Sequence, residues 1–324
     1  MVEDIRRKFK EFLRSRTSGR CMYTPPGGQS CSGKAIDSHS VQGKGPLSSI
    51  AENGHVYAIQ NGVVDGLPEG RVVDFKRIGV RKASVFPGFC KRHDSELFKL
   101  AEQESFDFDE KIVCMLLYRT ICREIVAARA NLKYAKYIGM HDRGGIAAYQ
   151  IYMRWKEVYE QHIWGQRAGN FGAVCFELAR PAPFCASVCF SPLATPNGVP
   201  LYIPVSPPFL GLFCGKFGGK NLLVLGGFSD IFGARNAFLR EVVEASQDRI
   251  GDIALKLSLE AGENVYFSPK WWEGLKDSDK SHLKSVFLST TPWGSFYDRA
   301  VARHPLNLLA ILAIRRFGVG VDSI

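Results

Sequence analysis

The sequence predicts an α+β fold, because its three regions differ in residue pattern. Residues 20–84 are rich in Gly, Pro and Ser with short alternating runs, whereas 109–138 and 146–164 carry apolar residues at helical spacing. Residues 169–324 begin with β-like runs separated by Pro and Gly, after which helical patterns return. We therefore expect an N-terminal module of strands and helix, a helical connector and a C-terminal α+β domain, with boundaries near 106 and 168.

The N-terminal module is expected to combine strands with one main helix. The runs GHVYAIQ (54–60) and RVVDFKRIGV (71–80) alternate apolar and polar residues, as half-buried strands do. A helix is expected to begin near Pro87 and to run to about Glu104. Ahead of these elements, apolar residues at helical spacing among Arg and Lys predict a short basic amphipathic helix within residues 1–16.

The rest of the chain is predicted to hold long helices followed by alternating strands and helices. Apolar periodicity predicts the helices, and short apolar runs rich in β-branched and aromatic residues predict the strands. The expected helices are 109–138, 146–164, 235–250, 278–288 and 296–316, and the expected strands are 172–179, 184–190, 199–205, 221–228 and 263–268.

The positive charge is concentrated in the first hundred residues. The net charge is +10, and residues 1–100 contain 17 Lys and Arg against 10 Asp and Glu, which leaves 25 against 22 in the remainder. A basic N-terminal third favours a polyanionic partner, and nucleic acid, DNA first, is the partner we expect. A solvated basic face is the alternative explanation.

No targeting or membrane segment is predicted. The N-terminus is charged throughout, and the longest apolar run, 305–314, is shorter than the roughly 20 residues that span a bilayer. We therefore expect a cytoplasmic protein without a membrane partner. The sequence does not specify an oligomeric state.

The cysteines divide into two groups by their surroundings. Nine cysteines in a chain without a secretion signal favour reduced thiols or metal ligands over disulfides. Cys21, Cys31 and Cys90 lie outside apolar runs, whereas the other six are expected to be small core side chains. The six are Cys114, Cys122, Cys175, Cys185, Cys189 and Cys214.

Three of the cysteines and one histidine are predicted to bind a structural zinc ion. Zinc prefers four soft or borderline ligands in a tetrahedron, which proteins usually supply as two close pairs. Cys21 and Cys31 flank the turn-forming segment MYTPPGGQS. Cys90 and His93 lie three residues apart at a predicted helix start, where the helix dipole favours a thiolate. The alternative is free cysteines and a surface histidine.

A further pattern lies between the two pairs. The run KAIDSHSVQ alternates and ends its predicted strand at His39, between two serines. A cysteine pair on a turn, a strand ending in histidine and a helix opening with metal ligands resemble the treble-clef arrangement of HNH, or ββα-metal, endonucleases. The resemblance covers roughly residues 18–105.

The resemblance implies a metal-dependent nuclease, with a role in restriction or anti-phage defence. His39 would be the general base acting on water, and Asp94 would bind a divalent cation, with Asp37 a weaker candidate. A carboxylate suits Mg²⁺ or Mn²⁺, and the cation would stabilise the leaving oxygen while His39 takes the proton.

Other interpretations stay open. His39 is alternatively a structural residue or a zinc ligand in place of Cys31, and Asp94 is alternatively a charge that favours the helix dipole. His55 alternates with apolar residues and is expected to be a half-buried strand residue. The alternatives for the whole chain are a non-catalytic zinc-stabilised protein that binds nucleic acid or another protein, and an active site wholly within the C-terminal domain.

Overall fold

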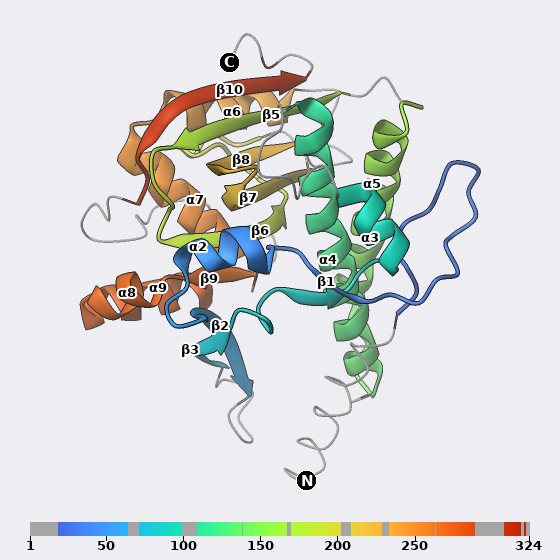
Figure 1. The fold of residues 1–324 in the computed structure, drawn as a ribbon, viewed down its shortest axis with the longest axis horizontal. Coiled ribbons are helices and arrows are strands. Elements are labelled where there is room, and N and C mark those ends of the chain that lie inside the picture. The colour runs from blue at the N-terminus through green and yellow to red at the C-terminus, as the bar shows by residue number, and fades with distance from the viewer. Residues whose placement is uncertain are drawn as a thin grey trace.

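The fold is α+β, with one large antiparallel sheet between two layers of helices (Figure 1). It is seen in a computed structural model. The structure describes residues 19–63, 71–98, 109–137, 139–166, 170–201, 209–228, 233–262, 264–288, 308–318 and 321.

The large sheet has eight strands in the order β10, β5, β8, β7, β6, β9, β2, β3, and every neighbouring pair is antiparallel. A second sheet pairs β1 with β4, and His39 lies opposite Val85 in it. The strand bounds are β1 (Asp37–His39), β2 (His55–Val63), β3 (Arg71–Gly79), β4 (Val85–Pro87), β5 (Phe171–Leu178), β6 (Phe184–Phe190), β7 (Phe209–Phe217), β8 (Lys220–Phe228), β9 (Val265–Phe267) and β10 (Ile311–Gly318).

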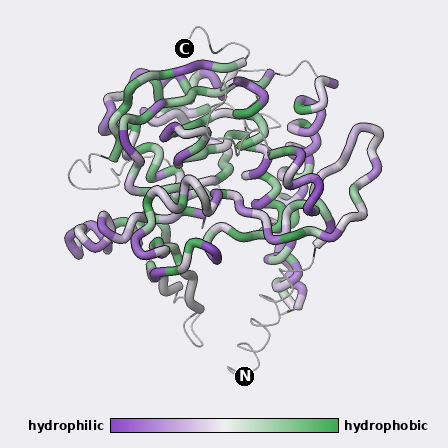
Figure 2. Tube along the Cα trace, in the orientation of Figure 1, coloured by the Kyte–Doolittle hydropathy of each residue, from purple (hydrophilic) through white to green (hydrophobic). Residues whose placement is uncertain are grey.

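Both faces of the central strands are apolar, because each face is covered by helices. Along β5, Phe171, Ala173 and Cys175 point to one hydrophobic core, and Val174 and Phe176 point to the other. Figure 2 shows apolar residues concentrated along these strands. A strand buried on both faces has no polar alternation, which explains the continuous apolar runs in the sequence.

The helices form one layer on each face of the sheet. The long helices α4 and α5 lie side by side on one face, whereas α6 and α7 share the core of the other. The helix bounds are η1 (Gly43–Leu47), α2 (Ser48–Ile50), α3 (Lys91–Phe98), α4 (Glu110–Tyr137), α5 (Arg143–Ile163), α6 (Ala234–Glu244), α7 (Gln247–Ala261), α8 (Pro269–Gly274) and α9 (Asp277–Leu288).

The sheet crosses the predicted regional boundaries. β2 and β3 come from the predicted N-terminal module, yet β2 pairs with β9 from the C-terminal region, with Tyr57 opposite Phe267. The boundaries at 106 and 168 stay predictions, but the two regions share one sheet. In addition, α4, which belongs to the predicted connector, forms part of the core over that sheet.

Most of the predicted elements are present, with two corrections. The helix predicted over 296–316 is wrong in its described part, because Ile311–Gly318 forms strand β10 along the edge of β5. The helix predicted over 235–250 is two helices, α6 and α7, separated by a break near Ala245. The predicted N-terminal basic helix and most of the predicted strand 199–205 lie outside the described residues.

A buried polar network ties the β1–β4 pair to the large sheet. The side chain of Asn264, which is fully buried, donates to the carbonyl of Ser187 at 2.7 Å and to Ser40 Oγ at 2.9 Å. Tyr266 donates its hydroxyl to Asn264 Oδ1 at 3.0 Å, and Ser187 Oγ lies 2.7 Å from Thr120 Oγ1 of α4. Because buried polar groups are costly when unpaired, this network fixes the orientation of the pair.

The Asn264 amide is therefore expected to be a stability determinant. Asn264→Ala leaves its buried partners unsatisfied and should lower the free energy of unfolding by about 1–3 kcal/mol, measured by urea denaturation. The matched control is Asn131→Ala on the exposed surface of α4, which should change stability by less than ~0.5 kcal/mol. Equal effects of the two substitutions would contradict the role of the network.

Candidate metal centre and its surroundings

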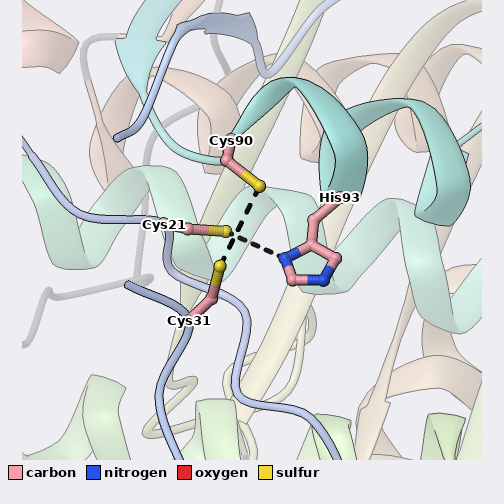
Figure 3. Close-up of side chains that lie close together, drawn as sticks. All are labelled: Cys21, Cys31, Cys90 and His93. Carbon is pink, nitrogen blue, oxygen red and sulfur yellow. Dashed lines mark hydrogen bonds between the residues drawn. The ribbon is translucent and has the colours of Figure 1, made fainter. Parts of the chain in front are cut away.

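Cys21, Cys31, Cys90 and His93 lie together, as the sequence predicted, and could hold a metal ion such as zinc. Their four ligand atoms are all within 4.8 Å of one another. Figure 3 shows Cys21 and Cys31 approaching from the loop while Cys90 and His93 approach from the start of α3. The six other cysteines are buried elsewhere, as predicted.

Backbone hydrogen bonds fold the loop so that its two thiols meet the helix. The Cys21 N–H donates to the carbonyl of Gly33 at 2.9 Å, and the Cys31 N–H donates to that of Tyr23 at 3.3 Å. The Gly33 N–H donates to Cys31 Sγ at 3.3 Å, an interaction that stabilises a thiolate. The Asp94 N–H bonds to the Cys90 carbonyl at 2.9 Å and continues α3 from that residue.

The spacing of the ligand atoms fits a tetrahedral zinc ion. Around zinc, with bonds of about 2.3 Å to sulfur and 2.0 Å to nitrogen, two sulfurs lie about 3.8 Å apart and a sulfur and a nitrogen about 3.5 Å apart. Cys31 Sγ lies 4.0 Å from Cys90 Sγ, and Cys21 Sγ lies 3.4 Å from His93 Nδ1. Three sulfurs and one imidazole are also a donor set that binds zinc in preference to hard cations such as Mg²⁺.

The protonation of the ligands links metal binding to proton release. Burial raises the pKa of the Cys21 thiol to about 12, so a metal ion has to displace a proton there. For Cys90, burial raises the pKa, but hydrogen bonds from the His93 N–H and from the neighbouring thiols outweigh it and lower the pKa overall. Burial and the nearby Arg92 lower the pKa of His93, which favours the neutral imidazole that binds metals.

Metal binding at His93 Nδ1 requires one side chain to move. Arg92 Nη2 lies 2.9 Å from His93 Nε2, and an arginine can only donate. When Nδ1 holds a metal, Nε2 carries the proton and no longer accepts. Arg92 is 71% exposed and also pairs with Glu96 at 3.4 Å, so it can turn to solvent at little cost.

The loop is also docked on the helical layer by a buried charge network. Glu160 Oε1 on α5 accepts hydrogen bonds from the Thr24 N–H at 3.0 Å, Tyr118 Oη at 2.7 Å and Lys156 Nζ at 2.6 Å. Tyr23 packs edge-on against the His93 ring, with centroids 4.5 Å apart. The loop that carries Cys21 and Cys31 is therefore held from both sides.

His39 lies outside the metal cluster and makes contacts of its own. It is half-buried at the end of β1, and its Nδ1 lies 3.0 Å from the carbonyl oxygen of Ala83 and 3.3 Å from Ser84 Oγ. Because Cys31 occupies the fourth position of the cluster, the alternative that His39 replaces it is wrong.

Asp94, Asp37 and His55, the other residues that the sequence singled out, also lie outside the metal cluster. Asp94 points to α4, where Arg119 Nη2 lies 3.1 Å from its Oδ1. Asp37 is exposed at the start of β1. His55, which the sequence predicted to be half-buried, is exposed instead and contacts the carbonyl of Asn53 at 2.7 Å.

No sequence pattern indicated the groups that hold these residues in place. Arg119, Glu160 and Asn264 lie 25, 136 and 224 residues from Asp94, Thr24 and Ser40, the partners they contact. Arg119 and Glu160 lie in helices that were predicted from apolar periodicity alone. A charged residue amid the apolar face of a predicted helix was the one available sign of a buried ion pair.

Comparison with protein-family models, curated proteins and solved structures found no significant match to this chain. None of the helices in the described part of the chain has the length and apolar character that crossing a bilayer requires. The functional argument therefore rests on the residues themselves.

Removing one ligand is expected to remove the metal. Wild type should contain one zinc ion per chain by elemental analysis, and Cys90→Ala should contain much less and unfold at a lower temperature. The matched control is Cys185→Ala, a buried cysteine outside the cluster, which should keep its zinc. Zinc retained by Cys90→Ala, or absent from wild type, would contradict the site.

A substitution at Gly33 tests whether close packing against Cys90 is needed for metal binding. A Cβ at this residue would lie 2.9 Å from Cys90 Cβ and 3.3 Å from Cys90 Sγ. Gly33→Ala should therefore weaken zinc affinity roughly tenfold or more in competition with a chromogenic chelator. Gly79→Ala is the control, since its Cβ would meet nothing within 4 Å, and its affinity should equal that of wild type.

Proposed function

We propose that the protein is a metal-dependent, HNH-like endonuclease whose N-terminal segment is stabilised by a structural zinc ion. The observation that carries the proposal is the arrangement around His39. β1 ends at His39 and pairs antiparallel with β4, and α3 begins at Lys91 soon after β4, with Cys90 immediately before it and His93 in its first turn. This strand, strand and helix order supports the resemblance to the ββα-metal family.

The surroundings of His39 suit a general base. Nδ1 faces the backbone carbonyl of Ala83, which can only accept, so Nδ1 carries the proton and Nε2 keeps its lone pair. Burial lowers the pKa of His39 and the Arg119 charge lowers it further, against opposing effects of the Ala83 carbonyl and of Asp94. The imidazole is then neutral near pH 7 and available to take a proton from water.

Asp94 is the proposed ligand of the catalytic cation. Its side chain is 20% exposed, and its negative charge raises the pKa of His39 against the larger lowering effect of burial. The hydrogen bond from Arg119 to Oδ1 orients the carboxylate and leaves Oδ2 for a hard cation. When bound, Mg²⁺ or Mn²⁺ would polarise the phosphate and stabilise the leaving oxygen.

A second candidate function follows from the ion pair between Arg119 and Asp94. The buried guanidinium of Arg119 already neutralises Asp94 within the fold, as expected where the pair is structural. In that case the zinc-stabilised segment is a non-catalytic element that binds nucleic acid.

Plasmid cleavage in Mg²⁺ or Mn²⁺ separates the two functions. Wild type should cleave, and His39→Ala should lose about 10²–10⁴-fold in rate while keeping its zinc and its unfolding temperature. Activity should persist below pH 6.5, because the pKa of His39 is lowered from that value and the base stays neutral. His55→Ala, an exposed histidine of β2, is the matched control and should cleave normally.

Equal cleavage by His39→Ala and wild type would exclude His39 as the base. Binding of DNA without cleavage by wild type would favour the non-catalytic alternative.

A further inference from the structure

The connected ends of α4 and α5 extend past the cores they pack against. From Ile112 to Val126, α4 is buried at nearly every position, but over 127–137 only Ala130 and Ala135 are buried. The fully buried residues of α5 begin at Trp155, and its partly buried residues that pack against the core begin at Tyr149, so only 143–148 of this helix lie beyond the core. At 1.5 Å per residue, 11 residues of α4 project about 16 Å. Figure 1 shows the two helices continuing together away from the sheet.

This projecting hairpin, residues 127–148, is basic. It contains four Lys and Arg and one acidic residue, Asp142. Asp142 is used locally, because its carboxylate accepts the Gly145 N–H at 2.8 Å and caps α5. Lys133, Lys136 and Arg143 are exposed, so their charges face solvent.

Exposed apolar side chains lie among these charges. Tyr137 is 49% exposed, Met140 61% and Ile146 37%. Only seven large hydrophobic side chains are this exposed in the described residues, and three of them are in the hairpin. Clustering of exposed apolar and cationic side chains at one end of a helix pair indicates an interaction surface.

The hairpin is continuous with the strand pair that carries His39. A Cβ at Gly19 would lie 3.3 Å from Arg129 Nη2 and 3.5 Å from the carbonyl oxygen of Pro87, so Arg129 of the hairpin lies beside β4. In β1, Asp37 is opposite Pro87, and His39 is two residues, or about 7 Å, further along the strand. A ligand lying along the hairpin would therefore pass beside the strand pair that carries the candidate base.

From this placement we infer that the projecting hairpin is a nucleic-acid-binding surface, contacted by the phosphate backbone. This inference rests on the proposed function and adds the surface that holds the substrate. Cations on both helices match a phosphate backbone, and Tyr137 offers a ring for base or sugar contact. These contacts depend on charge and not on base sequence. The hairpin therefore contributes affinity and orients the phosphate backbone of the nucleic acid toward His39.

The test is duplex binding without added Mg²⁺ or Mn²⁺, so that cleavage does not interfere. A fluorescent DNA duplex of about 20 base pairs is titrated with wild type and with the triple variant Lys133→Glu, Lys136→Glu, Arg143→Glu, over a range of salt concentrations. The control is Lys216→Glu, Arg240→Glu, Lys270→Glu, which makes the same charge change at exposed positions outside the hairpin.

The hairpin variant should bind at least about tenfold more weakly, and the slope of log affinity against log salt should fall by roughly 2–3, close to one unit for each phosphate that is no longer neutralised. The control should change affinity by less than about threefold. Equal weakening by both variants, or unchanged affinity of the hairpin variant, would overturn the inference. The inference would also be overturned if the hairpin variant lost binding to phosphatidylserine vesicles but kept its affinity for the duplex, because the surface would then bind a membrane.

The outcomes also separate this inference from the nuclease proposal. Duplex binding by wild type that is abolished in the hairpin variant, with no cleavage by wild type, supports the surface and removes the nuclease. Cleavage by a hairpin variant of unchanged affinity overturns the surface and leaves the nuclease standing.

Discussion

The burial of α4 on nearly all sides from Ile112 to Val126 is the constraint on which the other parts of the structure depend. Over this stretch the helix has no solvent face, so each polar side chain there needs a partner from another element. Tyr118 finds Glu160 of α5, and Thr120 finds Ser187 of β6. Arg119 bonds Asp94 of α3. Three consecutive residues thus fix the orientation of the helical hairpin, the sheet and the metal-binding segment relative to one another.

The metal-binding segment has too little regular structure to be stable by itself. β1 and β4 have three residues each, and the loop that carries Cys21 and Cys31 has no helix or long strand. A metal ion held by Cys21, Cys31, Cys90 and His93 would supply one set of restraints. The hydrogen bond of the Thr24 N–H to the buried Lys156–Glu160 pair supplies another. The pair contributes more to the position of the loop than to net stability, because buried ion pairs add little net free energy yet are costly to break.

The sequence predicted what depends on local spacing and missed what depends on distant pairing. The four ligands were predictable because two short spacings place them on a turn and on one helical turn. Strand β10 could not be predicted, since a short apolar run fits a helix or a strand equally well. Its pairing with β5 determines that it is a strand. The shared sheet was missed because the pairing of β2 with β9 joins residues about 200 positions apart, a separation that no periodicity records. Arg119 and Asn264 were missed for the same reason.

The large sheet also determines how firmly His39 is held. Its imidazole contacts Ser84 Oγ, whose hydroxyl donates to the carbonyl of Val41 at 2.5 Å, while Ser40 bonds both the Ser84 carbonyl and Asn264. This path continues through the Ser187 carbonyl into the strands. A side chain held by a three-residue strand alone would be mobile, but one supported by buried hydrogen bonds to a sheet keeps its orientation. The C-terminal strands therefore contribute to the orientation of His39 through buried hydrogen bonds.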